Sequence, residues 1–349
     1  MASVQFFWLN FHVGYACRHS GMCCTSGWPI PVEKNRVAVI DDAIARQVIP
    51  LQVEPWLVTG DEAPEDVAGI LALRSNGHCV FFEAGRPGCS IHDVKPAGCL
   101  HFPYLCLIDQ RGVHVTLSHY CPTAVAMLFE HHGPTVIVEG PPPIGDGQDV
   151  EGLDARESLP PTFAKASTFA QATVDKTVDN TVDKTAGKFS AARSRLMSFE
   201  ELAAWEREQV ASASIDELHA DDVALFERAR VSVPPPWTWP AVPEHLDEIW
   251  WSLVAPSWSR FNEVLARYAA AKTFASWSLY LGEGVDAAAG TARIAAAVLR
   301  IECARQCASF RRPLDRELLT EAIRQSDLLL VHYADPALLA ASSPDRPPD

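Results

Sequence analysis

Cysteine is distributed very unevenly along this chain. Eight of the ten cysteines lie between Cys17 and Cys121, and nine of the twelve histidines lie at or before His132. The segment CRHSGMCC at residues 17–24 holds three of these cysteines, and the last two are adjacent. Adjacent cysteines do not bond readily to each other, because the small ring would strain the S–S geometry. Their thiols must therefore be explained by something outside the pair.

Metal binding explains the clustered cysteines better than core packing or disulfide bonding. Gly and Pro flank the cysteines of GRPGCSIHDVKPAGC, and thiols carried on such loops are typical metal ligands. A single free cysteine is more often a buried apolar residue, but eight of them beside turn residues favour a metal site. Disulfides rank third because we expect a cytoplasmic protein, in which thiols stay reduced.

Composition limits the partners and the compartment. The net charge of −15 argues against binding to nucleic acid or to anionic membranes. No segment reaches the roughly 20 apolar residues of a membrane-spanning helix. The apolar opening MASVQFFWLNFHVGYAC lacks a basic residue before its apolar run and alternates like a buried strand, so we interpret it as part of the fold rather than as an export signal.

The sequence predicts an α+β protein that is mostly α, with a cysteine-rich module followed by a helical domain. Ser198 and Glu201 have the spacing of a capping box at the start of a helix. Helical periodicity follows around Leu265 and Tyr268, through Ile294 to Arg305, and in LDRELLTEAIRQSDLLLVHY. Before residue 139, YLCLID and GVHVTLSHYC are typical of strands, and VAMLFEHH is typical of a short helix.

Four regions are expected from these patterns. The repeat TVDKTVDNTVDK has too few large apolar groups to order itself, which indicates a linker. The predicted boundaries are 1–138 for a cysteine-cluster metal-binding domain, 139–194 for a low-complexity flexible linker, 195–340 for an α-helical domain and 341–349 for a disordered tail.

The cysteine spacing resembles that of the YkgJ-type cysteine-cluster family, whose members are described as zinc- or iron-chelating domains. The opening motif of that family, C-x2-C-G-x-C-C, is matched except that Ser20 stands where the second cysteine belongs. A second motif, C-x-I-[YH]-x3-P-x2-C-x2-[FY]-P, is matched from Cys89 to Pro103, and Lys95 occupies a position that is usually Arg. The matching residues are Cys17, Gly21, Cys23, Cys24, Cys89, Ile91, His92, Pro96, Cys99, Phe102 and Pro103.

The chain also resembles the flagellin lysine-N-methylase branch of this family. The similarity rests on Gly27 and Trp28 after the cysteine pair, on Cys121-Pro122-Thr123-Ala124 and on a helical C-terminal half. This resemblance implies a protein-lysine N-methyltransferase that acts on flagellin or a similar protein substrate with S-adenosylmethionine. A non-catalytic binding module with a structural metal is the other alternative. Catalytic residues and residues that bind the methyl donor cannot be named from the sequence.

Carried over position by position, the resemblance implies seven metal ligands: Cys17, Cys23, Cys24, Cys79, Cys89, Cys99 and Cys121. Seven thiolates exceed the four that one zinc ion accepts, so either two ions are bound or an iron–sulfur cluster takes four of them. Spacing alone does not separate zinc from iron–sulfur, and the resemblance favours iron–sulfur. The histidines that could replace the ligand missing at Ser20 are His78, His92, His101 and His119.

The remaining cysteines are expected to be core residues, and the adjacent pair to serve metal. Cys106 lies in an apolar strand, and Cys303 and Cys307 lie on an Ala-rich helix. Gly21 and Gly27 allow the sharp turn that two adjacent thiols need to reach one ion. The alternative is that Cys23 and Cys24 face different centres.

Overall fold

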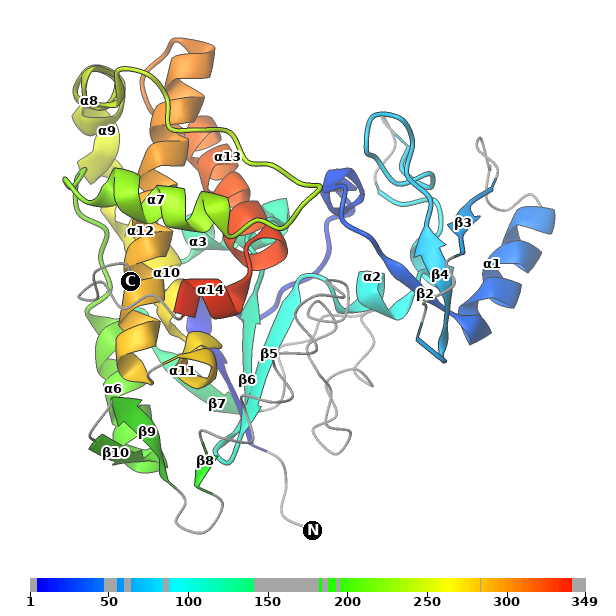
Figure 1. Cartoon of the computed structure of the whole chain (residues 1–349), viewed down its shortest axis with the longest axis horizontal. Coiled ribbons are helices and arrows are strands. Elements are labelled where there is room, and N and C mark those ends of the chain that lie inside the picture. The colour runs from blue at the N-terminus through cyan, green and yellow to red at the C-terminus, as the bar shows by residue number, and fades with distance from the viewer. Residues whose placement is uncertain are drawn as a thin grey trace.

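The computed structural model describes residues 5–46, 55–59, 64–83, 88–140, 197–282 and 284–340, and the backbone alone of 182–183, 188–192 and 195–196. The fold is α+β and mostly helical, as the sequence predicts. Figure 1 shows the long helices gathered in one body beside a small sheet, and a lobe with α1 and β2–β4 that extends away from it. Within the described residues, no helix has both the length and the apolar character to cross a membrane.

A four-stranded sheet contains the strands predicted at the apolar opening of the chain, in YLCLID and in GVHVTLSHYC. Its order is β5-β6-β1-β7. Strands β5 and β6 form an antiparallel hairpin, β6 and β1 run parallel, and β1 and β7 run antiparallel. The four bounds are Phe6–Leu9 for β1, Tyr104–Asp109 for β5, Gly112–Leu117 for β6 and Ile137–Gly140 for β7.

The predicted capping box opens the helical body. The Ser198 hydroxyl accepts from the Glu201 N–H at 3.2 Å, and the Glu201 carboxylate accepts from the Ser198 N–H at 2.8 Å. Helix α12 forms the centre of the body and packs against α7, α10 and α13. Its predicted apolar residues, Ile294, Val298 and Ile301, are all buried.

The elements of this body are, in order, α6 (Phe199–Ala211), α7 (Asp222–Val231), α8 (Leu246–Ile249), the π-helical turn η5 (Trp250–Val254), α9 (Ala255–Trp258), the 3₁₀ turn η6 (Ser259–Phe261), α10 (Asn262–Thr273), α11 (Ser278–Leu281), α12 (Val285–Phe310), α13 (Arg316–Asp327), the π-helical turn η7 (Leu328–Tyr333) and α14 (Pro336–Ala340).

A second, smaller lobe carries most of the cysteines. Its three-stranded antiparallel sheet has the order β2-β4-β3, and helix α1 packs beside β2 and β4. The elements are η2 (Met22–Thr25), β2 (Pro31–Glu33), α1 (Lys34–Ala45), β3 (Leu57–Val58), β4 (Val67–Leu71), η3 (His92–Val94) and α2 (Ala97–His101). Val32, Ile40, Trp56, Leu71 and Phe81 form the apolar part of its core.

The four-stranded sheet shares a core with the helices. Leu9, Leu107 and Leu128 belong to the same buried cluster as Leu265 and Tyr268. Helix α3 (Pro122–Glu130), which matches the predicted short helix, packs against α10 and α13. Residues on both sides of the predicted linker therefore fold together, whereas the small lobe has a core of its own. The predicted domain boundaries stay a prediction.

Parts of the predicted linker form strands. Strand β7 ends at Gly140 and so includes the first two residues of the linker predicted to start at 139. Within and after the linker, β8 (Val182–Asp183), β9 (Lys188–Ala192) and β10 (Arg195–Ser198) make a separate antiparallel sheet. The rest of the predicted linker, 141–181, 184–187 and 193–194, and the predicted tail, 341–349, lie outside the described residues.

Candidate metal centre

The adjacent cysteines lie on a sharp turn made possible by glycine. Residues Met22–Thr25 form the 3₁₀ turn η2, and Gly21 before it has a φ of 70°, a left-handed conformation that disfavours other residues. A Cβ atom on Gly21 would lie 2.7 Å from Cε2 of Phe82, so a larger side chain there would force the Phe82 ring to move. Cys24 is buried in the small-lobe core, and Cys23, which interacts with Cys24, contacts both this core and the core beside the four-stranded sheet.

Backbone pairing brings three further cysteines to Cys24. The Cys79 N–H donates to the Cys24 carbonyl at 2.8 Å. Cys89 is paired with Phe82 in an isolated β-bridge, which returns the chain to the same place. Cys99 lies on α2, and both Cys89 and Cys99 pack against the small-lobe core. We call Cys23, Cys24, Cys79, Cys89 and Cys99 the thiol cluster.

The thiols of this cluster are electrostatically coupled. Hydrogen bonding with Cys23, Cys79 and Cys89 raises the pKa of Cys24. The same contacts lower the pKa of Cys23, Cys79 and Cys89, because the single S–H of Cys24 stabilises a thiolate at any one of these positions. Burial and then the nearness of Cys89, Cys23 and Cys79 raise the pKa of Cys99. The five sulfur atoms thus belong to one group.

The two other predicted ligands lie beside Cys23. Cys121 directly precedes α3, and its sulfur lies 3.3 Å from the Tyr15 hydroxyl. Burial raises the pKa of Cys121, and hydrogen bonds from Tyr15 and from N–H groups of α3 partly oppose this effect. Cys17 accepts a hydrogen bond from the His19 N–H at 3.4 Å and packs against the same apolar core as Cys121. We call Cys17 and Cys121 the outer thiols.

The candidate replacement ligands are dispersed. Ser20, at the position of the missing cysteine, accepts from the Met22 N–H at 3.4 Å and so supports the turn. His92 packs its ring against His19 with 4.0 Å between centroids, and His78 interacts with Asn76 and Phe82. His101 is buried at the end of α2, and His119 belongs to a different network described below.

The cysteines are unbridged, and the cluster is not arranged as a finished metal site. All ten cysteines are free thiols. Among the described residues, no three His, Cys, Asp or Glu side chains are placed so that they could hold a metal ion as they stand. Side chains of the thiol cluster would therefore have to change rotamer before several of their sulfur atoms could coordinate one ion.

The turn η7 contacts the loop after the cysteine pair. The Tyr333 hydroxyl donates to the Ser26 carbonyl at 2.6 Å. The ring of His332 stacks on Trp28 with 4.2 Å between centroids, and its Nε2 lies 2.8 Å from the Ser118 hydroxyl. The turn η7 therefore fixes the loop that follows Cys23 and Cys24.

A buried network is centred on Asp327, the residue that precedes η7. Its carboxylate accepts from Lys272 at 2.6 Å, from Tyr268 at 3.0 Å and from the His119 N–H at 2.6 Å. The His119 ring lies 3.3 Å from that of His12. Burial opposes ionisation, but Lys272 and His119 outweigh it and hold the pKa of Asp327 below its usual range. Burial lowers the pKa of both histidines.

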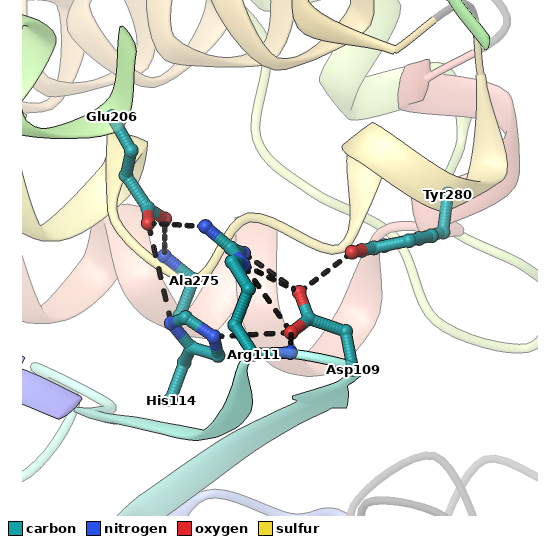
Figure 2. A network of polar contacts seen from close by, with 6 residues as sticks. All are labelled: Asp109, Arg111, His114, Glu206, Ala275 and Tyr280. Atoms are coloured by element: carbon teal, nitrogen blue, oxygen red, sulfur yellow. Dashed lines mark hydrogen bonds and ion pairs between the residues drawn. The ribbon is translucent and has the colours of Figure 1, made fainter. Parts of the chain in front are cut away.

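A second buried network joins the four-stranded sheet to the helical body. Figure 2 shows the Arg111 guanidinium between two carboxylates, with contacts of 2.7 Å to Asp109 and 3.0 Å to Glu206. Tyr280 donates to Asp109 at 2.7 Å, and His114 lies 3.3 Å from the same carboxylate. Glu206 also accepts from the Ala275 N–H. Because each charge has an opposite partner, this network is a structural link between elements.

Sequence reasoning missed both networks. Arg111 and Glu206 are 95 residues apart, and His119 and Asp327 are 208 apart. No local motif relates such pairs, because only the packing of the sheet against the helices brings them together.

Comparison of the chain with models of protein families, with curated proteins and with solved structures gave no match.

Proposed function

We propose that this chain is a metalloprotein whose thiol cluster binds zinc or an iron–sulfur cluster in the small lobe. The observation that carries the proposal is the convergence of five free cysteines from separate loops and short helices onto one buried place. Thiolate sulfur is the ligand shared by structural zinc sites and iron–sulfur clusters. Zinc would contribute folding energy to the lobe, and an iron–sulfur cluster would supply electron-transfer chemistry.

Two cysteines of the same chain show how core thiols differ from this cluster. Cys303 and Cys307 have no exposed surface and lie one turn apart on the long helix α12, packed in the main apolar core. Burial raises the pKa of Cys303 and raises that of Cys307 to about 12, which keeps both thiols protonated. The thiol cluster instead lies on turns, and hydrogen bonds there lower the pKa of three members.

The number of sulfurs fits a primary site with additional ligands nearby. The cluster holds one thiol more than a tetrahedral zinc ion accepts. Cys23 lies at the boundary with the outer thiols Cys17 and Cys121. Because Cys23 and Cys24 also interact with each other, we assign both to the primary site. The small size of the lobe also supports the proposal. A lobe with so small an apolar core gains much folding stability from a bound metal.

Metal analysis of anaerobically purified full-length protein tests the proposal. We expect about one zinc ion or one iron–sulfur centre per chain, with iron and acid-labile sulfide accompanied by visible absorption in the second case. Colourless protein that contains neither metal, and that takes up none when incubated with zinc or with iron and sulfide, would contradict it.

A further inference from the structure

One segment of the helical body holds two loops that carry candidate ligands. The segment, residues 324–333, comprises the last turn of α13 and all of η7. One loop, 25–28, begins directly after the adjacent cysteines, and the other, 118–121, ends at the outer thiol Cys121. The two loops are far apart in the sequence, so their common support comes from the fold alone.

The loop 118–121 is held through three successive residues. The contacts are Arg324 Nε to the Tyr120 carbonyl at 3.0 Å, the His119 N–H to the Asp327 carboxylate at 2.6 Å, and the Ser118 hydroxyl to Nε2 of His332 at 2.8 Å. All four residues of this loop are buried. The segment 324–333 therefore fixes the backbone immediately before Cys121.

The loop 25–28 is held by the last two residues of η7. The Tyr333 hydroxyl donates to the Ser26 carbonyl at 2.6 Å, and the His332 ring stacks on Trp28 with 4.2 Å between centroids. Gly27 has a φ of 77°, and a Cβ atom there would lie 3.4 Å from the Tyr333 hydroxyl oxygen. The loop thus lies in direct contact with the hydroxyl that holds it.

The two loops also contact each other. The Thr25 hydroxyl oxygen lies 3.3 Å from that of Tyr120. Cys23 and Cys121 pack in one apolar cluster, which also includes Tyr333. A movement of either loop away from η7 would therefore disturb the place where the thiol cluster meets the outer thiols.

We propose that residues 324–333 act as a clamp on the metal centre, in which Tyr333 is a positioning residue that slows the release of bound metal. This inference rests on the proposed function. A metal ion leaves when its ligands move apart, and the turn that carries Cys23 and Cys24 moves freely only after the loop behind it separates from Tyr333. The hydrogen bond to Ser26 therefore breaks before the metal is released, and it adds to the barrier.

The rate of zinc release from the full-length chain tests this role. Zinc-loaded wild type and Tyr333→Phe are mixed anaerobically with an excess of a chromophoric chelator. The substitution removes the hydroxyl and keeps the ring that packs near Trp237 and Trp239. We expect zinc release to be about threefold to tenfold faster, the range that corresponds to one hydrogen bond. Should this variant not fold, His332→Phe, which loses the contact with Ser118, takes its place with the same expectation.

Tyr280→Phe is the matched control. The Tyr280 hydroxyl donates at 2.7 Å to Asp109, in the network that joins the four-stranded sheet to the helical body. A hydrogen bond to a carboxylate is worth more than one to a carbonyl, so this variant should lose at least as much melting temperature as Tyr333→Phe. Its zinc release should nevertheless stay within about 1.5-fold of wild type, because the two sites share no partner.

A second measurement uses the reciprocity of coupling. If the clamp slows metal release, bound metal must in turn stabilise the clamp. Amide hydrogen exchange of residues 328–333 should therefore be slower in zinc-loaded wild type than in metal-free wild type. The difference should be smaller in Tyr333→Phe.

The outcomes distinguish the two proposals. Wild type that takes up no zinc contradicts the proposed function. Equal rates of zinc release in wild type and Tyr333→Phe contradict the clamp and leave the metal site intact. Equal acceleration in Tyr333→Phe and Tyr280→Phe also contradicts it, since release would then follow overall stability. Exchange in η7 that is the same with and without zinc contradicts it as well.

Discussion

At the scale of single residues, Cys24 has the most contacts with other thiols. It faces Cys23, Cys79 and Cys89 from a buried position. We expect Cys24→Ser to lose most of the bound metal, because a serine hydroxyl is a poor substitute for a thiolate ligand. Cys303→Ala in α12 is the control and should keep full metal content while losing some stability from the small cavity. Full metal content in Cys24→Ser would exclude Cys24 from the ligand set.

Asp327 carries a buried, paired negative charge in the helical body. Replacement of Asp327 by Asn leaves the Lys272 ammonium without its buried partner, so we expect a loss of about 3 kcal/mol in the free energy of unfolding. Urea denaturation at pH 7 measures this loss. The exposed pair Arg18–Glu130 is the control, since removal of Glu130 should cost less than about 1 kcal/mol.

The pH dependence of the same variant follows from the lowered pKa of Asp327. A carboxylate with a lowered pKa in the folded state stabilises the fold above its unfolded pKa of about 3.9, and this contribution is lost as the pH falls through the folded pKa. The difference in unfolding free energy between wild type and Asp327→Asn should therefore be constant from pH 7 to about pH 5 and narrow below about pH 4. A difference that widens in acid would contradict this sign.

At the scale of elements, the turn η2 depends on glycine. Gly14 and Gly21 have similar φ angles of 76° and 70°, but a Cβ on Gly14 meets nothing within 4 Å, whereas one on Gly21 meets Phe82. Gly14→Ala should therefore cost only the left-handed strain, about 1 kcal/mol. Gly21→Ala should cost more and also reduce metal content, because the turn carries Cys23 and Cys24. Thermal melts and metal analysis of both variants measure the two effects.

Elements defined by local pattern were predicted well. The capping box of Ser198 and Glu201 and the buried face of α12 are confirmed, because their signals lie within a few residues of sequence. Strands β1, β5 and β6 also match apolar segments of the sequence. The sheet β2-β4-β3 was not predicted, because its strands are two to five residues long and β2 pairs with β4 across about 35 residues.

At the candidate site, too, the features encoded by nearby residues were predicted, and those that depend on distant contacts were not. Spacing identified cysteines that the fold brings together, since five of seven lie in the thiol cluster. It did not separate the outer thiols Cys17 and Cys121 from this cluster. That distinction depends on which of the two cores each residue packs against.

At the scale of the whole molecule, the small lobe and the helical body have separate cores, and metal removal should affect them unequally. Amide hydrogen exchange with and without a chelator measures this. We expect amides of β2 and β4 to lose most of their protection without metal, while those of α12 change little, because the α12 core holds none of the predicted ligands. Equal loss of protection in both regions would show that metal supports the fold as one unit.

The contact between η7 and the loop after the cysteine pair has a consequence for biosynthesis. Tyr333 follows Ser26 by 307 residues, so the support for this loop is made only after all of these residues have been translated. At about 5 to 20 residues per second, that interval is on the order of tens of seconds. During this interval the thiols of Cys23 and Cys24 lie in a segment that lacks its contact with η7. A metal ion delivered before Tyr333 is translated would therefore bind thiols on an unfolded segment. An ion delivered later would bind thiols on a loop that η7 already holds in place.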